Sequence, residues 1–128
     1  MRKLLYLILA CVFLSACTQV PIGNGNNNPS NGQRIKAKVI RVTCATTVIQ
    51  ILDQNYYTLG ETWTENGTSA IYEHVAVVSN KCEFPASLAA GSEFYFKQIS
   101  ESEAQNDCAV CMLYDFPPAK GIFLKVIQ

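Results

Sequence analysis

The sequence predicts a small all-β domain that is stapled by disulfides. From residue 34 onward, short segments rich in β-branched and aromatic residues alternate between apolar and polar side chains, which is typical of strands. The segment best suited to a helix, residues 85–91, has room for a turn or two at most. Six cysteines in a chain of 128 residues indicate an oxidising compartment or a metal site.

The five predicted strands span residues 34–42, 46–53, 72–79, 93–99 and 121–127. In the first strand, residues 34–39 alternate strictly and residues 40–42 alternate in the opposite phase. Such a change of phase moves apolar side chains to the other face of a sheet unless a bulge absorbs it. We therefore expect a long first strand that bends near Val39 and Ile40.

The order of these elements resembles that of an OB-fold barrel, a five-stranded antiparallel architecture. The features in common are the long bent first strand, the short or missing helix between the third and fourth strands, and the large loop before the fifth. The resemblance covers residues 34–128 and is architectural, because no motif specific to one ligand is present. Another small antiparallel barrel or a sandwich has the same strand count and is the alternative.

The amino-terminal residues have the pattern of a signal peptide. Arg2 and Lys3 precede an apolar run that is too short to span a bilayer of about 30 Å as a helix. The segment Leu14-Ser15-Ala16-Cys17 resembles the lipobox of bacterial lipoproteins. This resemblance implies that residues 1–16 are removed and that Cys17 carries diacylglycerol and an acyl chain such as palmitate on its amino group. An ordinary secretory signal ending near Ala16 is the alternative, and it would leave Cys17 as a free thiol.

Residues 17–33 are predicted to be the lipidated cysteine and a flexible linker. The sixteen residues that follow Cys17 are rich in Asn, Gly and Pro and cannot bury enough surface to order themselves. Their root-mean-square span is about 20–25 Å. Thr18 rather than Asp follows the cysteine, which by analogy with known sorting rules favours the outer membrane. We therefore expect a lipid-anchored protein of the bacterial cell envelope that faces the periplasm.

The charge balance disfavours nucleic acid as a partner. The chain has ten Lys and Arg against ten Asp and Glu, and only 16% of its residues are charged. After removal of residues 1–16, eight basic and ten acidic residues remain. A surface that binds polyanions through a basic excess is therefore not expected for the chain as a whole.

Four cysteines remain in the predicted domain. If the second and third strands form a hairpin, paired residue numbers sum to about 125, and Cys44 and Cys82 then lie at the same end of the ladder. We therefore expect a Cys44–Cys82 disulfide, with Cys108 and Cys111 bridged to each other. The crossed pairings stay open. A zinc site is less expected, because only one close pair of cysteines is present.

The spacing of Cys108 and Cys111 also allows a thiol-disulfide redox function. In such proteins one thiolate attacks a substrate disulfide and the second cysteine resolves the mixed disulfide. No strand followed by a helix surrounds this pair, and Asp107 opposes thiolate formation at Cys108. We therefore favour structural disulfides and keep the redox function as an alternative.

No pattern of residues predicts an enzyme, a cofactor or a metal. His74 is the single histidine, and we expect it to be packed or half-exposed in the third strand. The acidic residues are scattered, and no nucleophile or metalloprotease motif is present. The prediction is therefore a non-enzymatic protein without a cofactor.

Aromatic residues in two predicted loops are the candidate binding residues. They are Tyr56, Tyr57, Trp63, Tyr114 and Phe116. Aromatic side chains on OB-fold loops stack on sugars or form protein interfaces. The alternative is that Trp63 and Tyr114 close the barrel as core residues. The sequence thus favours a binding module for an envelope protein or a glycan, with a thiol-disulfide redox protein and a small inhibitor of a secreted enzyme as alternatives.

Overall fold

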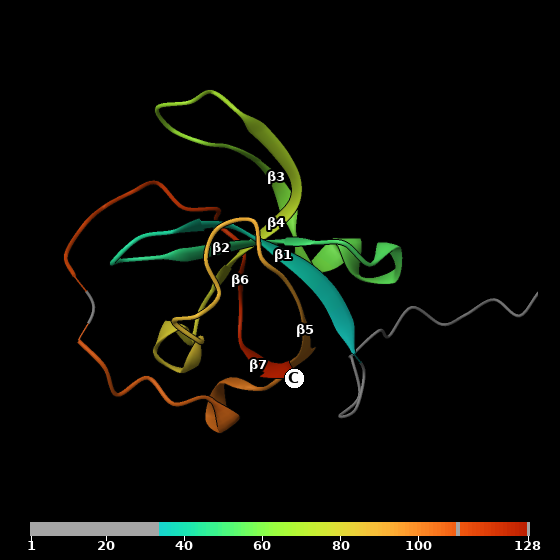
Figure 1. Ribbon diagram of the computed structural model, residues 1–128, viewed down its shortest axis with the longest axis vertical. Coiled ribbons are helices and arrows are strands. Elements are labelled where there is room, and N and C mark those ends of the chain that lie inside the picture. Colours follow the sequence, from blue (N-terminus) through green and yellow to red (C-terminus); the bar gives the residue numbers. More distant parts are fainter. Residues whose placement is uncertain (1–33, 110, 128) are drawn as a thin grey trace, which may run out of the picture.

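The computed structural model describes residues 34–109 and 111–127 (Figure 1). The predicted signal peptide, Cys17 and the linker lie outside these residues. No helix among the described residues is long and apolar enough to cross a membrane. The strands in this part of the chain are β1 (Ile35–Val42), β2 (Thr47–Ile51), β3 (Glu61–Thr64), β4 (Ile71–Val78), β5 (Glu93–Gln98), β6 (Gly121–Ile122) and β7 (Leu124–Ile127). Three short 3-10 helices accompany them, η1 (Gln54–Leu59), η2 (Lys81–Glu83) and η3 (Glu101–Glu103).

The sheet closes into a small OB-like barrel, as predicted. β1 pairs antiparallel with β2 on one side and with β5 on the other, and β2 pairs antiparallel with β4. β6 runs parallel to β4, while β7 runs antiparallel to β5. Because only Phe123 separates β6 from β7, these two segments act as one last strand that closes the ring.

A buried asparagine stabilises the point where the last strand changes partner. Asn80 is 1% exposed. Its Nδ2 donates to the carbonyl oxygen of Leu124 at 2.7 Å, and its Oδ1 accepts from the Leu124 amide at 2.9 Å. The backbone N–H and C=O groups of Leu124 are therefore paired with the Asn80 side chain instead of with the backbone of a neighbouring strand.

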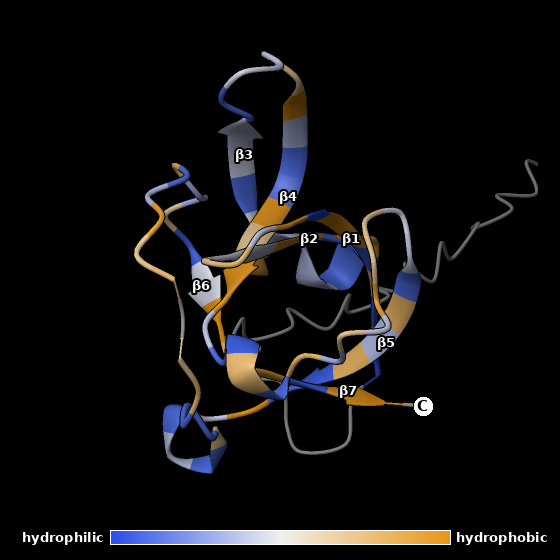
Figure 2. Cartoon of the chain, turned by 60° about the vertical axis from the view of Figure 1, so that its left-hand side comes forward, coloured by the Kyte–Doolittle hydropathy of each residue, from blue (hydrophilic) through white to orange (hydrophobic). Residues whose placement is uncertain are grey.

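The bulge predicted in the first strand is confirmed and separates two apolar clusters. The β1–β2 register shifts between Val39 and Arg41. Up to Val39 the apolar residues of β1 point into the barrel, whereas Ile40 packs against a second cluster on the outer face. The alternating colours of β5 in Figure 2 show the same division between inner and outer faces. The main core contains Ile35, Ala37, Val39, Ile49, Ile51, Tyr56, Ala76, Val78, Phe94, Phe96, Ile122 and Leu124.

Two local expectations were incomplete or wrong. Residues 61–64, expected in a loop, form β3, which pairs with β4. The predicted strand 121–127 is interrupted at Phe123 because its two halves pair with different neighbours. Residues 85–91, with room for a turn or two of helix at most, form turns without helix.

The predicted disulfide pairing is also wrong, although all four cysteines are bridged. Cys44 bonds to Cys111 and Cys82 bonds to Cys108, with Cα–Cα distances of 5.6 and 5.5 Å. The expected strand register is correct, since Val48 pairs with Val77. The ladder stops there, however, and η2 carries Cys82 away from Cys44. The two cysteines then meet different points of the loop between β5 and β6.

Digestion with trypsin under non-reducing conditions distinguishes these pairings. Cleavage after Arg41, Lys81, Lys97 and Lys120 places Cys44 and Cys82 in separate peptides and both Cys108 and Cys111 in a third. We expect one species in which three peptides are joined. Fragmentation between the two cysteines of the third peptide should assign the Cys44 peptide to Cys111. Two joined peptides plus a separate, internally bridged third peptide would contradict the observed connectivity.

Replacing Asn80 by alanine should destabilise the barrel by about 3 kcal/mol, because two buried backbone groups of Leu124 lose their partner. Urea unfolding at pH 7 measures the change. Asn66→Ala, at an exposed turn position, is the matched control and should change the free energy of unfolding by less than about 0.5 kcal/mol. A similarly small effect at Asn80 would show that water or a rearrangement replaces its hydrogen bonds.

Candidate functional site

The loop between β5 and β6, residues 99–120, is the main irregular feature of the molecule, and we refer to it as the long loop. Its two disulfides join it to the β1–β2 turn through Cys44 and to η2 through Cys82. Near its end, the Lys120 ammonium donates to the carbonyl oxygens of Thr58 and Gly60, both at 2.9 Å. The loop is therefore fixed to the barrel at several points, despite having little secondary structure.

Asp115 anchors the long loop beside the β1–β2 turn. Its Oδ2 accepts hydrogen bonds from the hydroxyls of Thr46 at 2.6 Å and Thr43 at 2.7 Å. The Arg41 guanidinium donates to the Asp115 carbonyl oxygen at 2.9 Å and lies 3.5 Å from Oδ2. Burial alone raises the pKa of the Asp115 carboxyl. The two hydroxyls and the charge of Arg41 outweigh burial, so the pKa lies below its usual value.

Trp63 fastens the next part of the loop and is not available on the surface. It is 8% exposed and packs in the second cluster with Val48 and Val75. Its indole N–H donates to the Phe116 carbonyl oxygen at 3.0 Å, and the Arg41 guanidinium lies 4.8 Å from its ring centroid. Trp63 thus covers part of the outer face of β2 and β4, which in OB folds is a common ligand-binding face.

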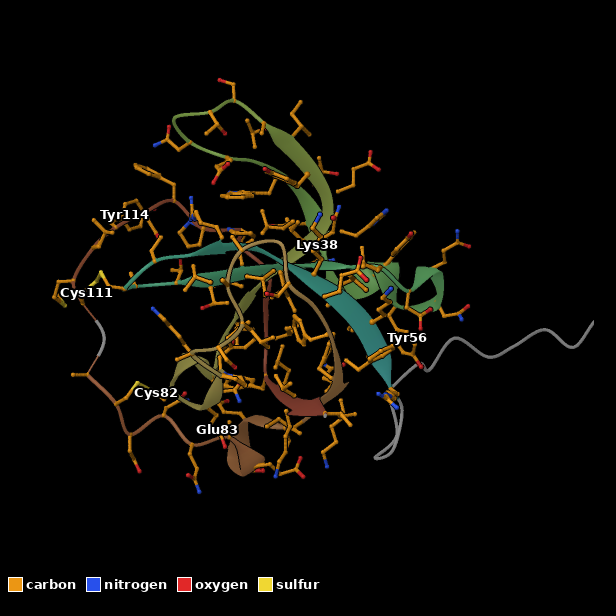
Figure 3. The ribbon with its side chains drawn as sticks, in the orientation of Figure 1. Lys38, Tyr56, Cys82, Glu83, Cys111 and Tyr114 are labelled. Atoms are coloured by element: carbon orange, nitrogen blue, oxygen red, sulfur yellow. A yellow bond between two sulfur atoms is a disulfide. The ribbon has the colours of Figure 1, made fainter. Side chains whose placement is uncertain are left out.

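The long loop exposes a run of large apolar side chains, which we call the apolar tip. Met112 is 99% exposed, Leu113 54%, Tyr114 74% and Phe116 52%. The rings of Tyr114 and Phe116 meet edge to face, with centroids 4.6 Å apart. Figure 3 shows Tyr114 and Cys111 on the stretch of loop nearest the β1–β2 turn. The tip is therefore held next to the Cys44–Cys111 bridge.

The backbone of Phe116 is in the left-handed region, with a φ of 48°. A bulky residue rarely adopts this conformation, which costs on the order of 1–3 kcal/mol. The Trp63 hydrogen bond to its carbonyl and the Asp115 anchor on the preceding residue hold this conformation in place. The direction of the exposed Phe116 ring is thus set by contacts on either side.

The two remaining candidate aromatic residues lie on η1 and do not join the apolar tip. Tyr56 is buried in the main core. Tyr57 is half-buried and stacks on His74, with ring centroids 3.6 Å apart and an interplanar angle of 3°. His74 has a φ of 57°, which interrupts the alternation of β4 and leaves its side chain 35% exposed. The structure therefore brings together Tyr114 and Phe116 of the five predicted residues.

Sequence reasoning missed Met112, Leu113, Asp115 and Arg41. Met112 and Leu113 form an apolar run with Tyr114 in a segment with no strand pattern, and that run was a usable signal. The anchoring pair had no such signal, because Arg41 and Asp115 are 74 residues apart.

The apolar tip itself carries thioether, aliphatic and aromatic side chains. Within the described residues, no group of three or more His, Cys, Asp or Glu side chains could hold a metal ion. Cys108 and Cys111 are each bonded to a distant cysteine rather than to each other.

No family model, curated protein or solved structure matches the chain.

Replacing Asp115 by asparagine should destabilise the protein by about 1.5–3 kcal/mol at pH 7, because the charged hydrogen bonds to Oδ2 are lost. The pKa of Asp115 is lower in the folded than in the unfolded state, so its contribution is complete above about pH 4 and disappears as the pH falls through the folded-state pKa. Urea unfolding at pH 7, 5, 4 and 3 should show the two proteins converging at the acid end. Asp107→Asn, an exposed change in the same loop, should unfold like the wild type. A difference that stays constant with pH would mean that the carboxylate charge is not involved.

Proposed function

We propose that this chain is a lipid-anchored protein of the bacterial cell envelope that binds a protein partner through the apolar tip, without catalysis. The observation that carries the proposal is the exposure of Met112, Leu113, Tyr114 and Phe116 on a loop that is fixed to the barrel. Large apolar side chains gathered on a surface are typical of interaction sites.

The anchoring of the loop favours tight binding. A flexible loop must lose conformational entropy when it binds, whereas a loop that is already ordered loses little. The Cys44–Cys111 bridge, Asp115 and Trp63 hold both ends of the tip. Aromatic side chains in such positions often dominate the binding energy of an interface.

The composition of the tip favours a protein over a glycan. Sugar sites combine an aromatic ring with polar groups that hydrogen-bond to the hydroxyls. Met112 and Leu113 offer no such groups, and the Asp115 carboxylate is only 11% exposed and engaged by two hydroxyls. An inhibitor of a secreted enzyme would be one kind of protein-binding module and would use the same surface.

The anchor is proposed from the lipobox-like segment ending at Cys17, and the position of the tip is consistent with it. Arg34, the first residue after the predicted linker, precedes β1, whereas the tip is tied to the turn that follows β1. Eight strand residues extend about 25 Å. In Figure 1 the tip accordingly lies at the other end of β1 from the point where residue 34 begins. A partner could reach it without competing with the membrane.

Photo-crosslinking in native envelopes tests this function. A photoreactive residue at position 114 should capture a protein, whereas the same residue at the exposed position Tyr95 should not capture it. With the purified partner, the triple variant Met112→Ser, Leu113→Ser and Tyr114→Ser should bind at least tenfold more weakly. Its free energy of unfolding should change by less than about 0.5 kcal/mol, because these side chains are exposed.

Mass spectrometry of the amino-terminal peptide from the same envelopes should show lipid on Cys17. An unmodified Cys17 would contradict the anchor. Equal capture from positions 114 and 95, or capture of lipid alone, would contradict binding through the apolar tip.

A further inference from the structure

Most of the basic residues of the predicted mature chain share one face of the barrel. The outer surface of β1, β5 and β7, together with the residue that precedes β1, carries five of the eight. We call this surface the basic face, and its cations are Arg34, Lys36, Lys38, Lys97 and Lys125. The other three basic residues, Arg41, Lys81 and Lys120, each donate hydrogen bonds to backbone carbonyl groups elsewhere in the fold.

The strand register places three of these cations side by side. Lys97 on β5 is directly opposite Lys125 on β7. Because Ile35 pairs with Phe96, the residue before Ile35, Arg34, falls opposite Lys97. Like charges directly opposite each other destabilise a sheet. This row of three cations therefore does not contribute to the stability of the sheet.

Acidic residues only partly neutralise the basic face. Among the described residues, the ion pair on this face joins Lys36 to Glu93, at 2.6 Å. Glu103 lies close enough to Lys97 and Lys125 to feel their charge, but its carboxylate is bonded to the amide and hydroxyl of Ser100. Glu101 precedes it in η3. Glu83 of η2 also feels the charge of Lys125, and its carboxylate accepts from the Asn80 side chain and the Gln105 amide. The five cations still exceed these four carboxylates.

The side chains between the cations suit a membrane interface. The Arg34 guanidinium lies 4.3 Å from the centroid of the Tyr95 ring, which is 38% exposed. Ile127 is opposite Tyr95 on β7. Basic residues next to tyrosine and aliphatic side chains are typical of surfaces at the headgroup level of a bilayer.

The basic face is also where the predicted linker joins the barrel. Arg34, part of the cation row, immediately follows the sixteen residues of the predicted linker, for which we expect a span of about 20–25 Å. A lipid on Cys17 would therefore keep this face close to the membrane. The apolar tip, tied to the far end of β1, would point away from it.

We propose that the basic face docks on the anionic headgroups of the membrane that holds the anchor, and so fixes the domain with its apolar tip outward. The orientation rests on the proposed lipid anchor, whereas the affinity of the face for anionic lipid does not. The recognised chemistry is the phosphate charge of the lipid, and the attraction falls off within a Debye length of the surface.

Vesicle binding without the anchor tests the proposal directly. The chain from residue 17 onward, with Cys17→Ser in place of the lipidated cysteine, retains every described residue. At low ionic strength it should bind vesicles of phosphatidylglycerol and phosphatidylcholine, but not vesicles of phosphatidylcholine alone. The double variant Lys97→Gln and Lys125→Gln should bind about 30-fold more weakly, since each basic residue near an anionic surface contributes about fivefold.

The matched control is Lys81→Gln with Lys120→Gln, which removes the same charge away from the basic face and should bind like the wild type once its folding is verified. The Lys97 and Lys125 variant should be at least as stable as the wild type at low salt, because an opposed pair of cations is removed. Its weaker binding could then not be attributed to unfolding.

Equal binding by the two double variants, equal binding to neutral vesicles, or binding of inorganic phosphate without binding of vesicles would each overturn the proposal. The triple serine variant of the apolar tip separates it from the proposed function. That variant should keep full vesicle binding while losing the protein partner. Loss of vesicle binding in that variant would assign membrane contact to the tip and contradict docking through the basic face.

Discussion

The hydrogen bonds between Asn80 and Leu124 are the interaction on which the rest of the structure depends. The last strand must pair with β4 in parallel and then with β5 in the antiparallel sense, and its backbone lacks ladder partners at the change. One buried amide supplies both a donor and an acceptor there. Without this closure, β5 and the carboxyl-terminal end of β4 would be exposed edges, and the main core would open on one side. Closure also requires a long connection from β5 back to β6, and that connection carries the candidate site.

The candidate site lies on the long loop rather than on the barrel because part of the barrel's outer face is already covered. In many OB folds the face over the second and third barrel strands is free for ligands. Here the β3–β4 hairpin and Trp63 cover part of it, and Arg41 ties the hairpin to the long loop through Glu65 at 3.8 Å and Asp115 at 3.5 Å. Among the described residues, four of the seven large apolar side chains that remain exposed are consequently on the loop, while Val42, Ile71 and Tyr95 lie on strands. The barrel provides rigid support, and binding would depend on residues whose positions are fixed by side-chain contacts rather than by strands.

The barrel could be predicted from the sequence, whereas the candidate site could not, because the site depends on contacts between residues far apart in the chain. Alternation and β-branched residues report local backbone geometry, so the five barrel strands, the bulge after Val39 and the β2–β4 register could all be predicted. The disulfide partners depend on the path of a loop with no repeating pattern. Along this path Cys111 bonds to Cys44 in the β1–β2 turn, and Cys108 bonds to Cys82 in η2. Trp63 was placed in a loop because the four residues of β3 are too few to show a period. The opposition of Lys97 and Lys125 depends on a strand pairing between residues 28 positions apart, which periodicity does not specify.

The nested arrangement of the two disulfides has a consequence for biosynthesis. The bridge spanning 26 residues lies wholly inside the one spanning 67 residues. In a chain exported amino terminus first, Cys44 and Cys82 reach the oxidising side before either of their partners. Oxidation in order of emergence joins these two cysteines to each other. The native bridges then form by thiol exchange, which takes seconds to hours at a rate set by the oxidant and by any isomerase present. If the chain is exported as proposed, maturation of this small barrel depends on the capacity of that compartment to reshuffle disulfides as well as to form them.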